Sequence, residues 1–278
     1  MKTITSRDNP TFKALRDLAG DARRQKREGR ALLEGPHLLA AALDHGVVPE
    51  LVAVAEEAVD HPEIAALLAR LPGVPVLCLR STLFREVSEL KTPVGILARI
   101  AVPNVTKAKD AVSSAPTLAP AGDCLLLDAV QDAGNVGTLL RTAAAAGVRD
   151  VLLGPGCAGA WTQRVLRAAQ GAHFSLAIHE NVDLAAFVQS FSGQSLATVA
   201  HGGESLYALD FSRPTAWLFG NEGAGLSPSL VAMAAKRVTI PLAADCESLN
   251  VAAAAAVCLF EMRRQRLIRH NPGGESTI

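Results

Sequence analysis

The sequence has no excess of either charge. Its 278 residues include 27 lysines and arginines and 27 aspartates and glutamates. A protein that binds a polyanion often carries a net positive charge, so the overall charge does not indicate such a partner. The charge is uneven, however, because eight basic residues stand against four acidic ones between Arg7 and Arg30. These eight are Arg7, Lys13, Arg16, Arg23, Arg24, Lys26, Arg27 and Arg30.

A second basic group lies near the end of the chain and comprises Arg263, Arg264, Arg266 and Arg269. Clusters of this kind fit either a solvated helix surface or a surface that binds phosphates. The sequence alone leaves both interpretations open.

Cysteine is scarce and scattered. The five cysteines are an odd number and include no Cys-x-x-Cys pair: Cys78, Cys124, Cys157, Cys246 and Cys258. This pattern excludes a disulfide framework and a cysteine zinc site, and it favours an intracellular protein. No group of His, Cys and carboxylate residues has the spacing of metal ligands, so we expect no metal.

Long hydrophobic runs are also missing. The N-terminal residues MKTITSRDNP contain no apolar segment of the kind that secretory signals carry. The longest apolar run, Val251 to Phe260, is about half of the roughly 20 residues that span a bilayer. We therefore expect a soluble, cytoplasmic protein with no membrane partner.

The length and the pattern of apolar residues predict two α/β domains. We place a small domain at residues 1–100, a linker rich in Pro, Ala and Ser at 101–122, and a second domain at 123–278. In the first, Asn9 and Pro10 open a helix, and strands are expected at Leu51–Ala55 and Val76–Leu79. In the second, short apolar strands alternate with helices, which indicates a largely parallel sheet covered on both faces. Ligands of such sheets bind beyond the carboxyl ends of the strands.

One loop of the second domain fits a dinucleotide site. Gly154, Gly156 and Gly159 form a G-x-G-x-x-G pattern between a strand and a helix, and Glu180 follows about 20 residues later. The strand before it is short, and Pro155 restricts a loop that would have to wrap a pyrophosphate. A dinucleotide-dependent enzyme is therefore an alternative, and it leaves three other polar loops unexplained.

The first of those loops contains Asn135, at the expected start of a helix over Val136–Ala146, and Arg141 within that otherwise apolar helix. Asn135 could be a helix N-cap only. Arg141 is expected to be buried, and a buried arginine is uncommon unless it is paired. A functional role for Arg141 therefore competes with a structural one.

The second loop follows a buried strand and holds Gly220 and Glu222, and the third precedes a helix expected at Leu249–Arg269. Glycines let a backbone approach a ligand closely, whereas a simple glycine turn would not require the acid at Glu222. In the third loop, Ser248 or Asn250 could again be an N-cap only. The alanine run that follows suggests close packing of that helix, for example against a partner subunit.

Together the three loops resemble a known family. The segments NVGTLLRTA, LFGNEGAGLS and IPLAADCESLNVAAAAAVCLFE resemble the three motifs of the SpoU or TrmH branch of the SPOUT RNA ribose methyltransferases, and the resemblance covers nearly all of Asp123 to Arg269. It includes GPGCAG…RVLRAAQGAHFSL, the segment that contains the dinucleotide-like loop. The N-terminal segment ITSRDNPTFKALRDLA…RALLEGPHLLAAAL is similar to the family's L30e-like RNA-binding domain.

This resemblance implies a function. It implies S-adenosylmethionine-dependent 2′-O-methylation of a ribose in ribosomal or transfer RNA by a homodimer whose sheet ends in a trefoil knot. The positions that match the cofactor site are Gly220, Ile240 and Leu249, with the loop from Thr198 to Gly203 alongside. The positions that match the catalytic and substrate-facing set are Asn135, Arg141, Glu222, Ser248 and Asn250.

Within that set we expect Arg141 to stabilise the forming alkoxide, since a guanidinium hardly deprotonates in a protein. Glu222 is expected to orient Arg141, and Asn135 and Ser248 to position the ribose. The chain departs from the family pattern at Ala133, Thr162-Gln163 and Ala169. An RNA-binding module with an inactive methyltransferase half is a further alternative.

Overall fold

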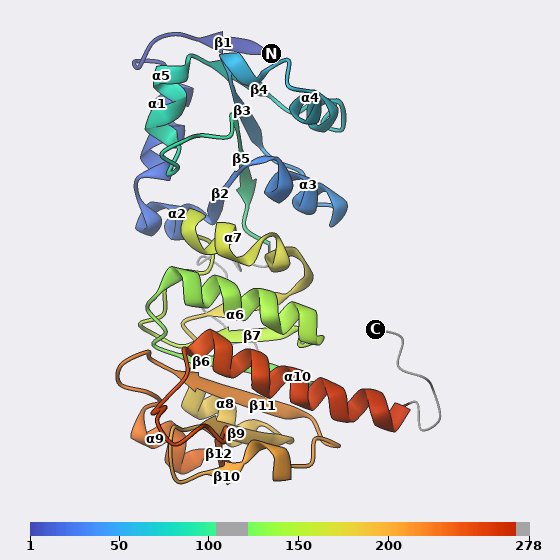
Figure 1. The fold of residues 1–278 in the computed structure, drawn as a ribbon. Helices are drawn as coiled ribbons and strands as arrows, with labels where there is room; N and C mark the ends of the chain where they lie inside the picture. The colour runs from blue at the N-terminus through green and yellow to red at the C-terminus, as the bar shows by residue number, and fades with distance from the viewer. Residues whose placement is uncertain (104–121, 271–278) are drawn as a thin grey trace. The chain divides into compact units, whose positions relative to one another are not determined.

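The computed structural model describes residues 1–103 and 122–270 (Figure 1). The predicted linker at 101–122 lies almost entirely outside these residues. The chain divides into two compact units, one combining Met1–Ser114 with Gly159–Phe174 and the other combining Ala115–Ala158 with Ser175–Ile278. In the part of the chain that is described, no helix is long and apolar enough to cross a membrane.

The first unit is a small α/β domain, as the sequence predicts. Its five-stranded sheet has the order β1-β4-β3-β5-β2, in which β5 runs antiparallel to both of its neighbours. The strands are β1 (Lys2–Ile4), β2 (Arg30–Glu34), β3 (Leu51–Ala55), β4 (Val76–Leu79) and β5 (Ile96–Ala101). The helices are α1 (Pro10–Ala19), α2 (Ala22–Glu28), α3 (Pro36–Asp44), α4 (Pro62–Ala69) and α5 (Ser81–Val87), with a 3₁₀ turn at Glu56–Ala58.

The N-terminal helices of this unit begin and end at capping residues. The Asn9 side chain accepts hydrogen bonds from the amides of Thr11 and Phe12, and Pro10 occupies the first turn of α1. Asp21 caps α2 in the same way, and Gly29 ends it with a φ of 61°. The apolar side of α1 is buried through Phe12, Leu15 and Leu18. The predicted helix start at Asn9-Pro10 is therefore confirmed.

Helix α7 (Gln163–Ala169) packs with the first unit, although it follows β7 in sequence. Leu166 belongs to the hydrophobic core that contains Leu33 of β2. Gln163, one of the departures from the family pattern, is buried and donates from Nε2 to Oε2 of Glu34 over 3.4 Å. Burial raises the pKa of the Glu34 carboxyl despite the hydrogen bonds it accepts.

The second unit contains a seven-stranded sheet of order β10-β12-β9-β11-β6-β7-β8, in which every neighbouring pair is parallel. The prediction of a parallel sheet is confirmed. Its strands are β6 (Cys124–Asp128), β7 (Asp150–Leu153), β8 (Ala177–Glu180), β9 (Gln194–Thr198), β10 (Glu204–Ser205), β11 (Thr215–Gly220) and β12 (Lys236–Thr239). Its helices are α6 (Ala133–Ala146), α8 (Leu184–Ser190), α9 (Pro228–Met233) and α10 (Val251–His270), with a 3₁₀ turn at Leu206–Ala208. Another 3₁₀ turn, Ala172–Ser175, spans the boundary at Phe174 where the chain passes from the first unit to the second.

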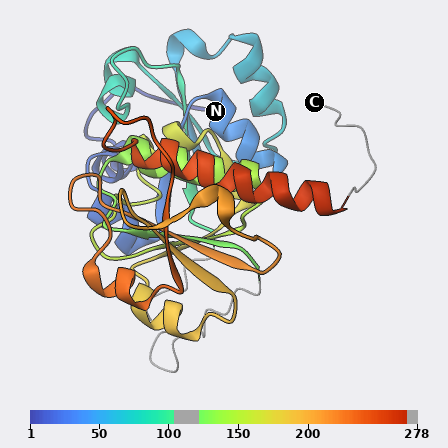
Figure 2. The ribbon, with the colours of Figure 1, turned by 60° about the horizontal axis from the view of Figure 1, so that its bottom comes forward.

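Helices cover both faces of this sheet. Alternate residues of the central strands, such as Leu126 and Leu218, form one core with Phe187 of α8 and Leu230 of α9. On the other face α10 lies along α6 (Figure 2). The indole Nε1 of Trp217 in β11 donates to Sδ of Met262 in α10, so α10 also closes over the sheet.

The starts of two helices differ from the sequence prediction. Helix α6 begins at Ala133, and its cap is Asp132, whose Oδ1 accepts from the amide of Asn135 over 2.7 Å. The interpretation of Asn135 as a helix N-cap is therefore wrong, because Asn135 lies inside the first turn. Helix α10 begins at Val251 rather than Leu249, and Asn250 does cap it, accepting from Ala252 and Ala253.

Candidate functional site

The site lies where the strand order of the parallel sheet reverses. Strands β6 and β11 are neighbours, yet the chain goes from β6 to β7 on one side of this pair and passes through β9 and β10 on the other side before it forms β11. Asp128 at the end of β6 pairs with Gly220 at the end of β11, so the loops that follow leave the sheet at the same level. Such a switch point is where parallel α/β sheets bind ligands.

The loop after β11 is fixed to the end of β6. Nδ2 of Asn221 donates to the Ala129 carbonyl over 2.9 Å, while its Oδ1 accepts from the amides of Gly223 and Ala224. Oδ2 of Asp128 accepts from the Ser227 amide over 2.8 Å. Each end of the loop is therefore held by a side chain, and Glu222 between them has a defined position.

Gly220 is required by this loop rather than by a ligand alone. A Cβ atom at position 220 would lie 2.2 Å from the carbonyl carbon of Gly225 and 2.2 Å from the Leu226 nitrogen. The loop passes so closely over its own first residue that no side chain fits there. A larger residue at this position would displace the loop itself.

The carboxylate of Glu222 accepts three hydrogen bonds. Its Oε1 accepts from Nδ2 of Asn135 over 3.0 Å and from the Asp132 amide over 3.1 Å, and its Oε2 accepts from the Gln131 amide over 3.3 Å. Partial burial alone would raise the pKa of Glu222, but these hydrogen bonds outweigh it and the pKa lies below its usual value. At neutral pH the group is therefore a carboxylate that only accepts.

The charge of Glu222 sets the direction of a longer chain of hydrogen bonds. Because Asn135 donates to the carboxylate, its Oδ1 faces the other way and accepts from Nδ2 of Asn250 over 3.0 Å. Asn250 then uses its own Oδ1 to cap α10. These hydrogen bonds thus join the loop after β11, the first turn of α6 and the start of α10.

Arg141 and Ser248 take no part in this series of hydrogen bonds. Arg141 is exposed on α6, and among the described residues its side chain has no hydrogen bond or ion pair. The expectation that Arg141 is buried is therefore wrong, and within one chain Glu222 binds Asn135 rather than orienting Arg141. Ser248 is exposed, and among residues 1–103 and 122–270 only its carbonyl has a hydrogen bond, which it accepts from the Cys246 thiol over 3.4 Å.

A second group of predicted residues lies at the ends of three neighbouring strands, β12, β9 and β11. Oγ1 of Thr198 donates to the Leu218 carbonyl over 2.7 Å and ties β9 to β11. The amide of Gly203 donates to Oγ1 of Thr239 over 3.0 Å, where a Cβ atom at position 203 would lie 2.8 Å from the carbonyl carbon of Val238. The loop after β9 therefore crosses directly over the end of β12.

The segment that leads from β12 to α10 offers both apolar and polar groups. Ile240, which follows the end of β12 rather than lying inside the strand, is half-buried, and the side chain of Leu249 is 38% exposed. Within the described chain, the peptide groups of residues 241–249 make only two hydrogen bonds, from the Cys246 amide to Ala243 and from its thiol to Ser248. Unpaired peptide groups beside exposed aliphatic side chains fit a small ligand that has an apolar face and polar edges.

The glycine pattern at Gly154–Gly159 does not form a phosphate site. The Gly154 amide donates to the Leu127 carbonyl, and the Ala158 amide donates to Val130, so both are used within the protein. A Cβ atom at position 154 would lie 2.9 Å from Cδ1 of Leu184, and α7 does not begin until Gln163. These contacts disfavour a dinucleotide enzyme, since a pyrophosphate needs free amides and a helix N-terminus.

No group of His, Cys, Asp and Glu residues able to hold a metal ion occurs within residues 1–103 and 122–270. The sequence interpretation gave no role to four residues that hold Glu222 and its loop, namely Gln131, Asp132, Asp128 and Asn221. Asp132 was visible as a possible cap three residues before Asn135. The two backbone amides that bind Glu222 carry no signal in the residue types.

Comparison with known proteins agrees with this geometry. The family model "SpoU rRNA Methylase family" matches residues 124–260, and the "MRM3-like substrate binding domain" model matches residues 9–98. The uncharacterized tRNA/rRNA methyltransferase slr1673 of Synechocystis is 35% identical over 98% of this chain and 97% of that protein. RlmP of Bacillus subtilis, named a 23S rRNA (guanosine(2553)-2′-O)-methyltransferase, is 34% identical over 95% of this chain and 100% of its own length.

Solved structures give the same result. The AdoMet-bound rRNA methyltransferase from Sinorhizobium meliloti superposes with a TM-score of 0.77 at 29% identity, covering 95% of this chain and 97% of that one. An RNA 2′-O ribose methyltransferase superposes with a TM-score of 0.78 at 28% identity, covering 95% and 99%. The likeness extends over both units and over the loops of the switch point, and the chain therefore belongs to the SpoU rRNA methylase family.

Proposed function

We propose that this chain is an S-adenosylmethionine-dependent enzyme that methylates a ribose 2′-hydroxyl of ribosomal RNA. The observation that carries the proposal is the series of hydrogen bonds from Glu222 through Asn135 to Asn250 at the switch point of the sheet. The protein that contains it is 34% identical to RlmP over the whole length of RlmP. An inactive methyltransferase half would have no need to keep this polar set intact.

The residues near Thr198, Gly220, Ile240 and Leu249 fit the cofactor. The aliphatic side chains of Ile240 and Leu249 would contact its adenine, and the unpaired peptide groups of residues 241–249 would bind its polar edges. S-adenosylmethionine supplies, when bound, a methyl group on a sulfonium for in-line transfer to an oxygen. The trefoil knot expected for the family would explain why the backbone crosses so closely at Gly203 and Gly220.

The other polar residues position the ribose and stabilise its charge. Asn135 keeps one N–H and one oxygen lone pair after its bonds to Glu222 and Asn250, and with the Ser248 hydroxyl it would hold the ribose. Arg141 remains charged and exposed, so it would stabilise the alkoxide that forms as the hydroxyl loses its proton. Glu222 acts through Asn135 as a positioning residue.

The remaining assignments follow from this function. Residues 1–100 would bind the RNA as an L30e-like domain, and residues 123–278 would form the methyltransferase domain in a cytoplasmic protein that needs no metal.

We expect the full chain to bind S-adenosylmethionine in calorimetry and not NAD. The methylation assay would use a transcript of 23S rRNA that includes the guanosine equivalent to position 2553, the nucleotide in the name of RlmP. Two results would support the proposal: the RNA retains the incorporated methyl label in alkali, and alkaline cleavage of the RNA backbone is blocked at one ribose. RNA binding without turnover would favour the inactive module, and binding of NAD without S-adenosylmethionine would favour the dinucleotide enzyme.

We further infer that the active protein is a homodimer in which Asn135 or Arg141 of one subunit lies near the cofactor of the other. Helix α10 supports this, because Phe260, Leu267 and Ile268 on its surface are 48%, 57% and 56% exposed. Large aliphatic and aromatic side chains gathered on one helix commonly mark an interface. Arg141 also lacks a partner within the described part of its own chain.

Sedimentation should therefore give twice the chain mass of 29.0 kDa at micromolar concentration. Phe260→Asp should shift the protein to monomer, because a carboxylate at an apolar interface is left unpaired. Val48→Asp is the matched control, since Val48 is 64% exposed on the first unit and should leave the dimer intact. A wild-type protein that sediments only as a monomer would refute the inference.

A further inference from the structure

Helix α2 carries three cations on one exposed face. Arg23, Lys26 and Arg27 are spaced i, i+3 and i+4, which places them side by side on the helix surface, and all three are exposed. On its inner side the helix is held by Gln25, which is buried and donates from Nε2 to the Leu18 carbonyl over 2.9 Å. The helix is thus anchored with this cationic face toward solvent.

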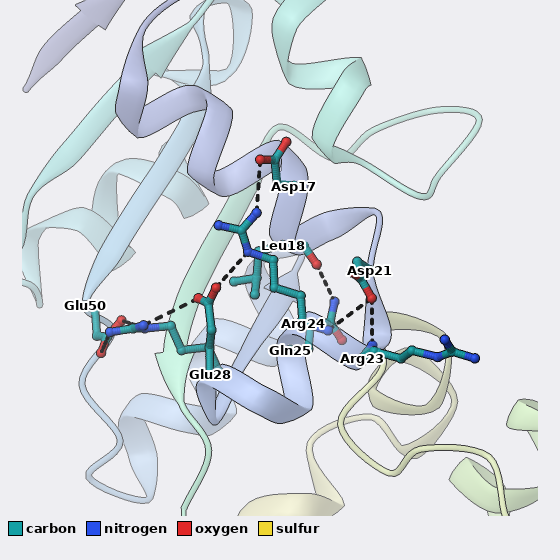
Figure 3. A network of polar contacts seen from close by, with 9 residues as sticks. Asp17, Leu18, Asp21, Arg23, Arg24, Gln25, Glu28 and Glu50 are labelled. Atoms are coloured by element: carbon teal, nitrogen blue, oxygen red, sulfur yellow. Dashed lines mark hydrogen bonds and ion pairs between the residues drawn. The ribbon is translucent and has the colours of Figure 1, made fainter.

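The other basic residues of the segment form ion pairs within the protein. Arg24 pairs with Asp17 and Glu28 (Figure 3). Arg30 pairs with Glu28 and Glu50. Arg7 pairs with Glu86, Lys13 with Asp8 and Arg16 with Asp17. In contrast, Arg23, Lys26 and Arg27 form no ion pair with any described residue, and Figure 3 shows the Arg23 side chain pointing away from the acids.

Three unpaired like charges on one turn repel one another and destabilise a helix. The interaction of Lys26 and Arg27 with the C-terminal end of the helix dipole offsets part of this cost, but Arg23 lies in the first turn, where a cation is unfavourable. An external polyanion would remove the repulsion. The side chain of Asp21, the acid next to this face, caps the helix by accepting from the amides of Arg23 and Arg24, and within the described residues it forms no ion pair with the three cations.

We propose that Arg23, Lys26 and Arg27 form a binding site for the phosphate backbone of the RNA substrate, while the other five cations between Arg7 and Arg30 have structural roles. This inference rests on the proposed function for the identity of the RNA. The face lies within residues 9–98, which match the substrate binding domain model. The eight basic residues of the segment thus fall into two classes, three that bind RNA and five that form ion pairs within the protein, and the sequence does not distinguish them.

The test compares two triple variants of the full chain that lose the same charge. Arg23→Gln/Lys26→Gln/Arg27→Gln removes the unpaired cations, and Arg7→Gln/Lys13→Gln/Arg16→Gln removes three paired ones from the same unit. The probe is a fluorescein-labelled 23S rRNA transcript, and its affinity is measured by polarisation between 50 and 200 mM salt. Each lost phosphate contact lowers the slope of log K against log salt by about 0.7 to 0.9.

The first variant should therefore lose about 2 units of slope and at least tenfold in affinity at low salt. The control should keep the wild-type slope, and both should bind S-adenosylmethionine like the wild type. Arg23→Gln alone should lower the slope by about one contact. Arg23 lies at the N-terminal end of the helix dipole, where a positive charge is unfavourable, so its removal should not destabilise the helix. A loss of RNA affinity in this single variant would therefore not be explained by a loss of stability.

Equal slopes in the two triple variants would overturn the proposal, as would a melting temperature that falls in the first variant while its RNA affinity stays unchanged. Polyglutamate and unlabelled RNA are also compared, at equal total charge, as competitors of the labelled transcript. If polyglutamate displaces the transcript as well as RNA does, the site would instead bind an acidic protein partner. Wild-type methylation of the same transcript is measured in parallel. RNA binding that depends on α2 without any methylation would contradict the proposed function and leave this site standing.

Discussion

Replacement of Arg141 by alanine is expected to slow methyl transfer by roughly 100-fold or more, the usual effect of losing a group that stabilises developing negative charge. The fold should not suffer, because Arg141 is exposed and has no partner among the described residues of its chain. Alanine is also a better helix former, so the free energy of unfolding should change by no more than about 0.5 kcal/mol. Cofactor binding should remain close to that of the wild type.

Single-turnover rates at saturating RNA and cofactor measure this effect, with melting temperatures taken in parallel. Arg141→Lys should restore only part of the rate, because an ammonium keeps the charge but not the planar pair of donors. Arg149→Ala is the charge-matched control: Arg149 precedes β7 at the amino edge of the sheet, opposite the site, and donates to the Ser175 carbonyl. A stable Arg141→Ala protein with a normal rate would end the assignment of Arg141 to the reaction.

The sequence predicted those elements whose boundaries are marked by residue type. Strands β3 and β4 were predicted at Leu51–Ala55 and Val76–Leu79, where the structure has them, because each is a short apolar run. Strand β1 and helix α2 were missed. Lys2–Ile4 is a three-residue edge strand, and Ala22–Glu28 has no apolar stripe, since only Gln25 is buried.

The candidate site was predicted in its residue types but not in its connections. The three polar loops belong to strands and helices whose neighbours depend on strand order, and no local pattern specifies that β11 lies between β9 and β6. The start of α6 was ambiguous, because Asp132 and Asn135 are both good caps and only the backbone decides between them. Arg141 was expected inside because its neighbours are apolar, yet α6 has too many alanines for the sequence to reveal which side faces water.

The second large effect is expected at Glu222, where glutamine should weaken cofactor binding and slow methyl transfer together, each by roughly tenfold, the scale of one charge-assisted hydrogen bond. Three donors converge on the carboxylate, from Asn135, Asp132 and Gln131. Glutamine offers only one accepting oxygen, and its amide nitrogen would face another N–H. Asn135 is then free to rotate, and Asn250 loses the acceptor that fixes the start of α10.

The pH dependence separates this positioning role from proton transfer. The pKa of Glu222 is below its usual value of about 4.3, so the stabilisation it provides is complete above that pH and is lost only as the pH falls through the lower, folded-state value. From pH 6 to 9 the group stays ionised, and the ratio of the wild-type rate to the Glu222→Gln rate should be constant. Glu86→Gln, which removes a carboxylate paired with Arg7 in the first unit, should leave both cofactor affinity and rate unchanged. A rate ratio that changes tenfold per pH unit within this range would instead make Glu222 a proton acceptor, because only a group that titrates there can impose that slope.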